Sequence, residues 1–127
     1  MIKVKHFMDP VEPDDGKRLW VEPIGLTLDL QQWCAVHYVL PHFGPPRNVW
    51  DWFEERRGSE GYEHFRGVYH EHLDKGQLRK ILLEMVRLSG KGSDFTLLHQ
   101  GDDPGHNTAT ALHEYMSELG SYCPPEA

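Results

Sequence analysis

The order of three segments in the second half of the chain constrains the fold more than any other feature. The first, KGQLRKILLEMVRLSGKG at 75–92, has apolar residues at helical spacing and a stop at Gly90. The second, DFTLLHQG at 94–101, is a compact apolar run whose length suits a strand buried on both faces. The third resumes helical spacing as far as Gly120. This order predicts an α/β fold, a single small domain in which helices pack on a short, mainly parallel sheet.

The last helix is predicted to begin at Asp103. Asp103 is a favourable N-cap, and Pro104 suits the first helical position because its missing N–H is not needed there. Gly120 ends this helix, and we expect the tail 120–127 to be loose. The expected core stripes are Thr108, Leu112, Tyr115 and Leu119 on this helix, and Leu78, Ile81, Leu82, Met85 and Leu88 on the preceding one.

The first half of the chain is predicted to contribute two strands and two helices. IKVKHF at 2–7 alternates as a strand does, and a second short strand follows at 18–22 after turn residues. Helices are predicted within 42–58 and 60–73, whereas 26–41 fits both a strand and a helix and is left mixed. The helical faces are Val49, Trp52 and Phe53, with Gly58 as the stop, and Tyr62, Phe65, Tyr69 and Leu73, with Ser59 as the N-cap.

Length and charge limit the classes of protein to which the chain can belong. Its 127 residues correspond to one ordinary domain, 1–127. No apolar run approaches the roughly 20 residues of a membrane span, and the start lacks the features of a secretory signal. We therefore expect a soluble cytoplasmic protein that does not bind membranes. The net charge of −7 and the scattered Arg and Lys residues argue against nucleic-acid binding.

Cysteine and histidine usage matches no established metal motif. Cys34 and Cys123 are too few and too far apart for a disulfide framework, and we interpret them as ordinary thiols. Cys34, His37 and His42 could hold zinc with a fourth ligand from elsewhere, but this spacing belongs to no known motif. Neither a phosphate-binding glycine loop nor a nucleophile elbow is present. We expect no metal and no cofactor.

Polar residues gather in the loop GDDPGHN at 101–107, directly after the strand predicted at 95–100. In open parallel sheets, ligands bind beyond the carboxyl ends of strands, where helices begin with free N–H groups. The loop is therefore predicted to face a ligand, with acceptors, a general base and an amide within reach of one molecule. In the opposing interpretation, Asp103 only caps a helix and Asp102 is only solvated. The candidate ligand-binding residues here are His99, Asp102, His106 and Asn107.

Several motifs share their order and spacing with one known family. They include Lys5 followed by Asp9-Pro10, DGKRLWVE at 15–22, Trp33, FRGVY at 65–69, and FTLLHQGDDPGHNTA at 95–109. From Lys5 to about Leu119 the chain resembles the YeaO-like family, catalogued as domain of unknown function 488. The resemblance implies an α/β fold, and it gives family counterparts to Arg18 and Glu22, which we add to the ligand-binding candidates. It implies no established activity.

The chain departs from the pattern of that family directly after Glu22. There PIGLT replaces a loop that is usually rich in arginine and tryptophan, and Ala35 replaces a usual lysine. His72 stands for a usual glutamate and His99 for a usual tyrosine. The feature that carries over is the loop with His106 and its neighbouring asparagine.

These observations favour binding of a small molecule, an anion among the candidates, at the loop after the strand predicted at 95–100; whether catalysis follows is open. The alternative is a non-catalytic protein-interaction or regulatory module that uses the aromatics of NVWDWF, and a homodimer is equally open. A pocket at 99–107 lined by Glu22 favours the first interpretation. A flat edge with Trp50 or Trp52 buried against another chain favours the second.

Overall fold

Four parallel strands form one sheet in the computed structural model, which describes residues 1–56 and 59–122. Their order across the sheet is β1-β4-β2-β3, and each neighbouring pair runs parallel. The predicted α/β fold with a mainly parallel sheet is confirmed. The strands are β1 (Ile2–His6), β2 (Lys17–Trp20), β3 (Tyr38–Val39) and β4 (Phe95–His99).

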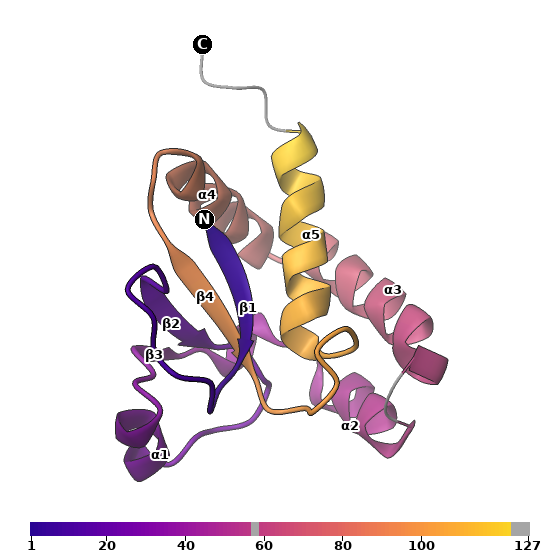
Figure 1. Cartoon of the computed structure of the whole chain (residues 1–127). Helices are drawn as coiled ribbons and strands as arrows, with labels where there is room; N and C mark the ends of the chain where they lie inside the picture. Colours follow the sequence, from indigo (N-terminus) through magenta and orange to yellow (C-terminus); the bar gives the residue numbers. More distant parts are fainter. Residues whose placement is uncertain (57–58, 123–127) are drawn as a thin grey trace.

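Most of the helices cover one face of this sheet. Figure 1 shows α5 running alongside β1, with α3 on its far side and α4 near the start of β1, whereas α1 lies at the β3 end. No helix among the described residues is both long and apolar enough to cross a membrane. The helices are α1 (Leu28–Trp33), α2 (Arg47–Arg56), α3 (Ser59–Lys75), α4 (Leu78–Gly90) and α5 (Thr108–Tyr122), with a short 3-10 turn, η1, at Pro41–Phe43.

The apolar run at 94–101 is a strand because it occupies the centre of the sheet. β4 lies between β1 and β2, so both of its faces are covered, and Leu97 and Leu98 are fully buried on opposite sides. Leu97 packs into the helical layer, and Thr96 on the other face donates from Oγ1 to the backbone carbonyl of Asp15 at 2.7 Å. The second face is therefore covered by the loop between β1 and β2.

The stretch 26–41, which the sequence left undecided between a strand and a helix, contains both α1 and β3. On α3, the whole predicted face is buried. Two other helical faces differ from their predictions. On α4, Ile81 and Leu88 are 49% and 39% exposed, because the helix contacts its neighbours α3 and α5 only through a narrower stripe. On α2, Trp50 is buried in place of Val49 and Trp52, which are only partly covered.

The start of α5 corrects the prediction that Asp103 is its N-cap. The helix begins at Thr108, and Asn107 caps it by accepting a hydrogen bond at Oδ1 from the backbone N–H of Thr110 at 2.8 Å. Asp103 instead accepts from the N–H of Gly105 at 3.0 Å, which closes a turn before the helix.

The other end of α5 also differs from its prediction. Gly120 does not end the helix, since residues 120–122 continue it. The remaining tail, 123–127, lies outside the described residues, as do the predicted stop at Gly58 and the thiol of Cys123.

Replacing Asn107 by alanine should lower the free energy of unfolding by about 1 kcal/mol, because the N-terminus of α5 loses its cap. The side-chain amide of Asn107 also donates to the carbonyls of Asp103 and Pro104 at 2.8 and 3.2 Å, so the preceding turn loses two hydrogen bonds as well. Urea denaturation of Asn107→Ala and Asp103→Ala measures both contributions. A larger loss for Asp103→Ala than for Asn107→Ala would contradict this assignment of the cap.

Candidate functional site

A cavity of about 510 Å³ lies at the carboxyl edge of the sheet. It is enclosed by the segment after β2, by α2, by the loop after β4 and by the start of α5. A ligand site is expected at this edge of an open parallel sheet. The residues that line it are Glu22, Phe53, Glu54, Gln100, Gly101, Asp102, Asp103, His106, Asn107 and Thr108.

Four of the six predicted ligand-binding residues come together here: Glu22, Asp102, His106 and Asn107. The structure places the other two elsewhere. His99 ends β4 and lines a neighbouring cavity, and Arg18 is fully buried in β2.

Glu22 is the most deeply buried charged group of this cavity, with 1% of its surface exposed. One carboxylate oxygen accepts from Nε1 of Trp50 at 3.1 Å, and the other accepts from the backbone N–H of Gln100 at 3.0 Å. The Thr108 hydroxyl is a further hydrogen-bond partner. The carboxylate is thus held at a fixed position by α2, the end of β4 and the start of α5.

Burial raises the pKa of Glu22, and its hydrogen bonds from Thr108, Gln100 and Trp50 offset this only in part. The charge of Glu54 raises it further. Within the described residues, no Lys, Arg or His side chain forms an ion pair with Glu22, although such a pair would lower its pKa. Among the described residues, Glu22 therefore has no cationic partner of the kind that a buried carboxylate normally has.

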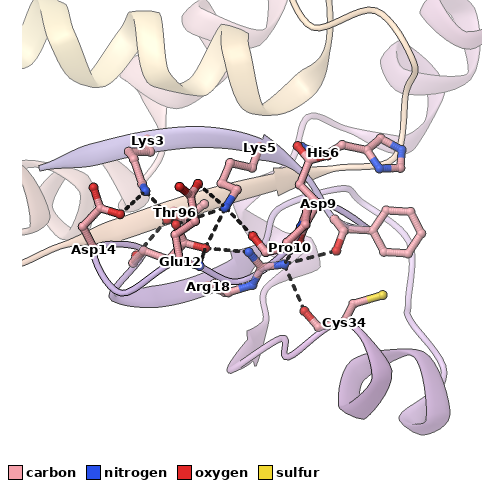
Figure 2. A network of polar contacts seen from close by, with 12 residues as sticks. Lys3, Lys5, His6, Asp9, Pro10, Glu12, Asp14, Arg18, Cys34 and Thr96 are labelled. Atoms are coloured by element: carbon pink, nitrogen blue, oxygen red, sulfur yellow. Dashed lines mark hydrogen bonds and ion pairs between the residues drawn. The ribbon is translucent and has the colours of Figure 1, made fainter.

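Arg18 belongs to a different cluster, on the face of the sheet covered by the loop between β1 and β2. Its guanidinium donates to Asp15 at 2.7 Å and to the backbone carbonyls of Phe7, Asp9 and Cys34 at 3.2, 3.1 and 3.0 Å. Figure 2 shows these bonds converging on Arg18 from separate parts of the chain. Arg18 therefore holds together the N-terminal loop, and it does not line the Glu22 cavity.

Asp15 in this cluster is a second buried carboxylate, and unlike Glu22 it has cationic partners. Lys3, Lys5 and Arg18 approach it within 2.6, 3.0 and 2.7 Å. Burial alone would raise the pKa of Asp15, but the hydrogen bonds from these three cations hold it well below its usual range. One chain thus contains two buried carboxylates, of which Asp15 has three cationic partners and Glu22 has none within the described residues.

Asp103 and His106 form a pair at the opening of the cavity. Oδ2 of Asp103 lies 2.8 Å from Nδ1 of His106, and this contact lowers the pKa of Asp103. The ring of Tyr62 packs edge-on against the imidazole at 5.0 Å. A carboxylate on Nδ1 orients the ring and leaves Nε2 as the nitrogen that can exchange a proton with a bound molecule.

The charge of the cavity is acidic. Its described lining includes four carboxylates and no Lys or Arg: Glu22, Glu54, Asp102 and Asp103. An anion would meet repulsion here, whereas a cation or a strong hydrogen-bond donor would be attracted. Of the candidates left open by the sequence, the anionic ligand is therefore disfavoured.

Sequence reasoning missed several residues of this cavity. Gln100 acts through its backbone N–H, so its side-chain type gives no signal. Phe53 and Glu54 lie on α2, as does Trp50, which donates to Glu22; the helical pattern of α2 was visible in the sequence, but its position against the carboxyl edge was not. Thr108 was placed on the core stripe of α5, and it is indeed buried, beside Glu22.

Replacing Glu22 by glutamine should change how stability depends on pH. A carboxyl group whose pKa is raised in the folded state contributes stability that is fully present below its unfolded pKa and is lost as pH rises through the folded pKa. The stability of wild type relative to Glu22→Gln should therefore fall from about pH 4 toward neutrality. Denaturant melts across this range measure the difference, with Glu118→Gln, an exposed change on α5, as the control. A relative stability that rises with pH would contradict the assignment.

The described residues contain no group of three or more His, Cys, Asp or Glu side chains that could hold a metal ion. Residues 3–116 match the model of a family described as "Domain of unknown function DUF488". No curated protein and no solved structure matches the chain.

Proposed function

The chain belongs to the DUF488 family, and we propose that it binds a small molecule with a cationic, N–H-donating group in the cavity at Glu22. The observation that carries this proposal is the buried carboxylate of Glu22, which lacks a cationic partner among the described residues. A buried charge without a partner is costly, so a structure keeps one where a ligand supplies the partner. An ammonium or guanidinium group in the cavity would supply it.

The remaining lining of the cavity suits the same ligand. Asp102 is exposed, whereas Asp103 is oriented by its contact with His106, so both can attract a cation at the opening. Phe53 gives the inner wall an apolar ring for the carbon skeleton of the molecule. The Nε2 atom of His106 can accept a proton from the ligand, which leaves proton transfer as the chemistry that this site supports best.

A thermal-shift comparison of small cations and anions at equal ionic strength tests the proposal. Butylamine, methylguanidine and spermidine are expected to raise the melting temperature, whereas phosphate and citrate are not. Asp102→Asn should weaken the shift given by the amines, and Glu22→Gln should abolish it. Asp29→Asn, an equal change of charge at an exposed position on α1, serves as the control and should leave the shift intact. Stabilisation by the anions alone, or equal amine shifts in all variants, would overturn the proposal.

A second candidate function, docking of another protein, is favoured by a different surface from the one suggested by the sequence. Trp50 is buried inside the chain, and the Trp52 ring is covered by Arg56 at 4.0 Å. The most exposed aromatic side chain among the described residues is instead Trp33 at the end of α1, with 86% of its surface accessible. Sedimentation of wild type and Trp33→Ser over a range of concentrations tests whether this surface pairs two copies of the chain. Identical monomeric behaviour of both would exclude that form of docking.

A further inference from the structure

A second cavity, of about 400 Å³, lies beside the first at the carboxyl ends of β1 and β4. The two cavities share Gly101 and Asp102, so this short stretch of the loop is a common wall between them. A molecule that passes over Asp102 can therefore occupy both. What the second cavity binds depends on which of its polar groups are still available.

His99 provides the most informative group in this cavity. The residue is 3% exposed, and its Nδ1 atom is buried without a hydrogen-bond partner among the described residues. Burial lowers the pKa of His99, and a hydrogen bond to the Gly101 backbone opposes this shift. A neutral imidazole carries one N–H, and in the tautomer with its proton on Nε2, the Nδ1 atom is an acceptor. A buried acceptor without a donor is costly, so it indicates a missing partner.

The basic groups that line this cavity are already engaged. Nζ of Lys5 contacts Glu12 and Asp15 at 3.0 Å each and donates to the Pro10 carbonyl. Both ring nitrogens of His6 are occupied, by the Gln100 carbonyl at 3.1 Å and by the N–H of Met8 at 3.2 Å. Figure 2 shows the Lys5 ammonium turned toward the acidic cluster and the His6 ring turned away from it.

The groups that remain available are acceptors. They are the carboxylates of Asp102 and Asp9, of which one Asp9 oxygen already accepts from the N–H of His6 at 3.1 Å, together with Nδ1 of His99, which has no partner among the described residues and lies beneath the cavity surface. The second cavity therefore suits a group that brings N–H or O–H donors and, like the first, does not suit an anion.

We propose that the second cavity is a subsite for the far end of the same ligand, which makes the ligand class a molecule with donors at both ends, such as a diamine. This inference rests on the proposed function, because the Glu22 cavity holds the first end. Asp102 lies between the two positions and contacts the middle of the molecule or either amino group. Binding at two linked positions raises affinity without any change in the first site.

Isothermal titration calorimetry with butylamine, putrescine and spermidine tests the subsite. For wild type, the better of the two polyamines should bind about tenfold more tightly than butylamine. His99→Phe should remove this advantage and leave butylamine binding unchanged, whereas His99→Gln, which keeps an acceptor, should retain most of it. His42→Phe makes the same change at an exposed position outside both cavities and should have no effect.

A measurement on the unmodified protein complements the variants, because a buried substitution at His99 can impair folding. The nitrogen NMR shift of His99 Nδ1 should move when putrescine is added and should stay in place when butylamine is added. If the polyamine advantage survives in His99→Phe, or if Nδ1 does not respond to putrescine, the cavity holds only water and the subsite is refuted, while binding at Glu22 stands. If butylamine does not bind wild type, or binds Glu22→Gln equally well, the proposed function itself fails, and the subsite fails with it.

Discussion

Replacing Gly16 by alanine is expected to lower the free energy of unfolding by about 4 kcal/mol, a large part of the stability of a domain of this size. Gly16 precedes β2 and has a φ of 62°, a left-handed conformation that side chains rarely adopt. A Cβ atom there would lie 2.0 Å from the backbone oxygen of Asp94 and 2.5 Å from its carbonyl carbon. Because these atoms belong to the backbone just before β4, no side chain can move aside to relieve the clash.

Two matched variants separate the causes of this loss. Gly92→Ala tests the backbone conformation alone, since Gly92 also has a positive φ of 104° but nothing lies near its added Cβ. Gly25→Ala is the control for both effects, because the surroundings of Gly25 are open and its φ is not in the left-handed region. Urea denaturation should rank the three losses as Gly16 above Gly92 above Gly25. A loss for Gly16→Ala no greater than that for Gly92→Ala would show that the backbones of β2 and β4 do not approach as described.

Replacing Arg18 by methionine should also cost about 4 kcal/mol, because it removes one member of a buried charge network. Methionine fills a similar volume, but the carbonyls of Phe7, Asp9 and Cys34 lose their donor and Asp15 loses one of its three cations. The loop that covers the second face of the sheet would then be released from β2. Denaturant melts measure the loss, and hydrogen exchange of residues 7–16 should accelerate with it.

Arg47→Met is the control for this change. Arg47 lies on the surface of α2, where its contact with Asp51 is open to solvent on both sides and its guanidinium lies over the Trp50 ring at 5.2 Å, so its removal should cost less than about 1 kcal/mol. If Arg18→Met cost no more than this, the buried network would not be what holds the N-terminal loop in place.

A helix or strand could be predicted from the sequence where the spacing of its apolar residues matches the faces that the fold buries. The run FTLLH is apolar on both faces because β4 is central, and α3 shows its buried face in the regular spacing of its aromatics. The strand order β1-β4-β2-β3 was not predictable, because β1 and β2 are consecutive in the chain but are separated by a strand that arrives some 75 residues later. The exposure of Ile81 was not predictable either, since it depends on how α4 packs against its neighbours.

The position of the cavity was predictable, but its charge and its details were not. Polar residues after a buried strand indicated the loop that lines the cavity, and Glu22, another candidate from the sequence, lines it as well; that these residues bind a ligand stays a prediction. Asp103 has the chemistry of an N-cap but uses it on Gly105 and His106, because Asn107 stands nearer the helix and competes for the same role. The sequence does not indicate that the guanidinium of Arg18 donates to Asp15 and to backbone carbonyls from distant segments.

The central claim is that Glu22 is a buried carboxylate whose cationic partner is a ligand. Titration of its side-chain carboxyl carbon by NMR, in the free protein and again with saturating butylamine, tests this claim directly. In the free protein the pKa should lie above the ordinary value for glutamate, since burial raises it and no cation of the described chain opposes the shift. With the amine bound, the pKa should fall, because the ammonium group stabilises the carboxylate. A pKa at or below the ordinary value in the free protein, or one that butylamine does not move, would contradict the account.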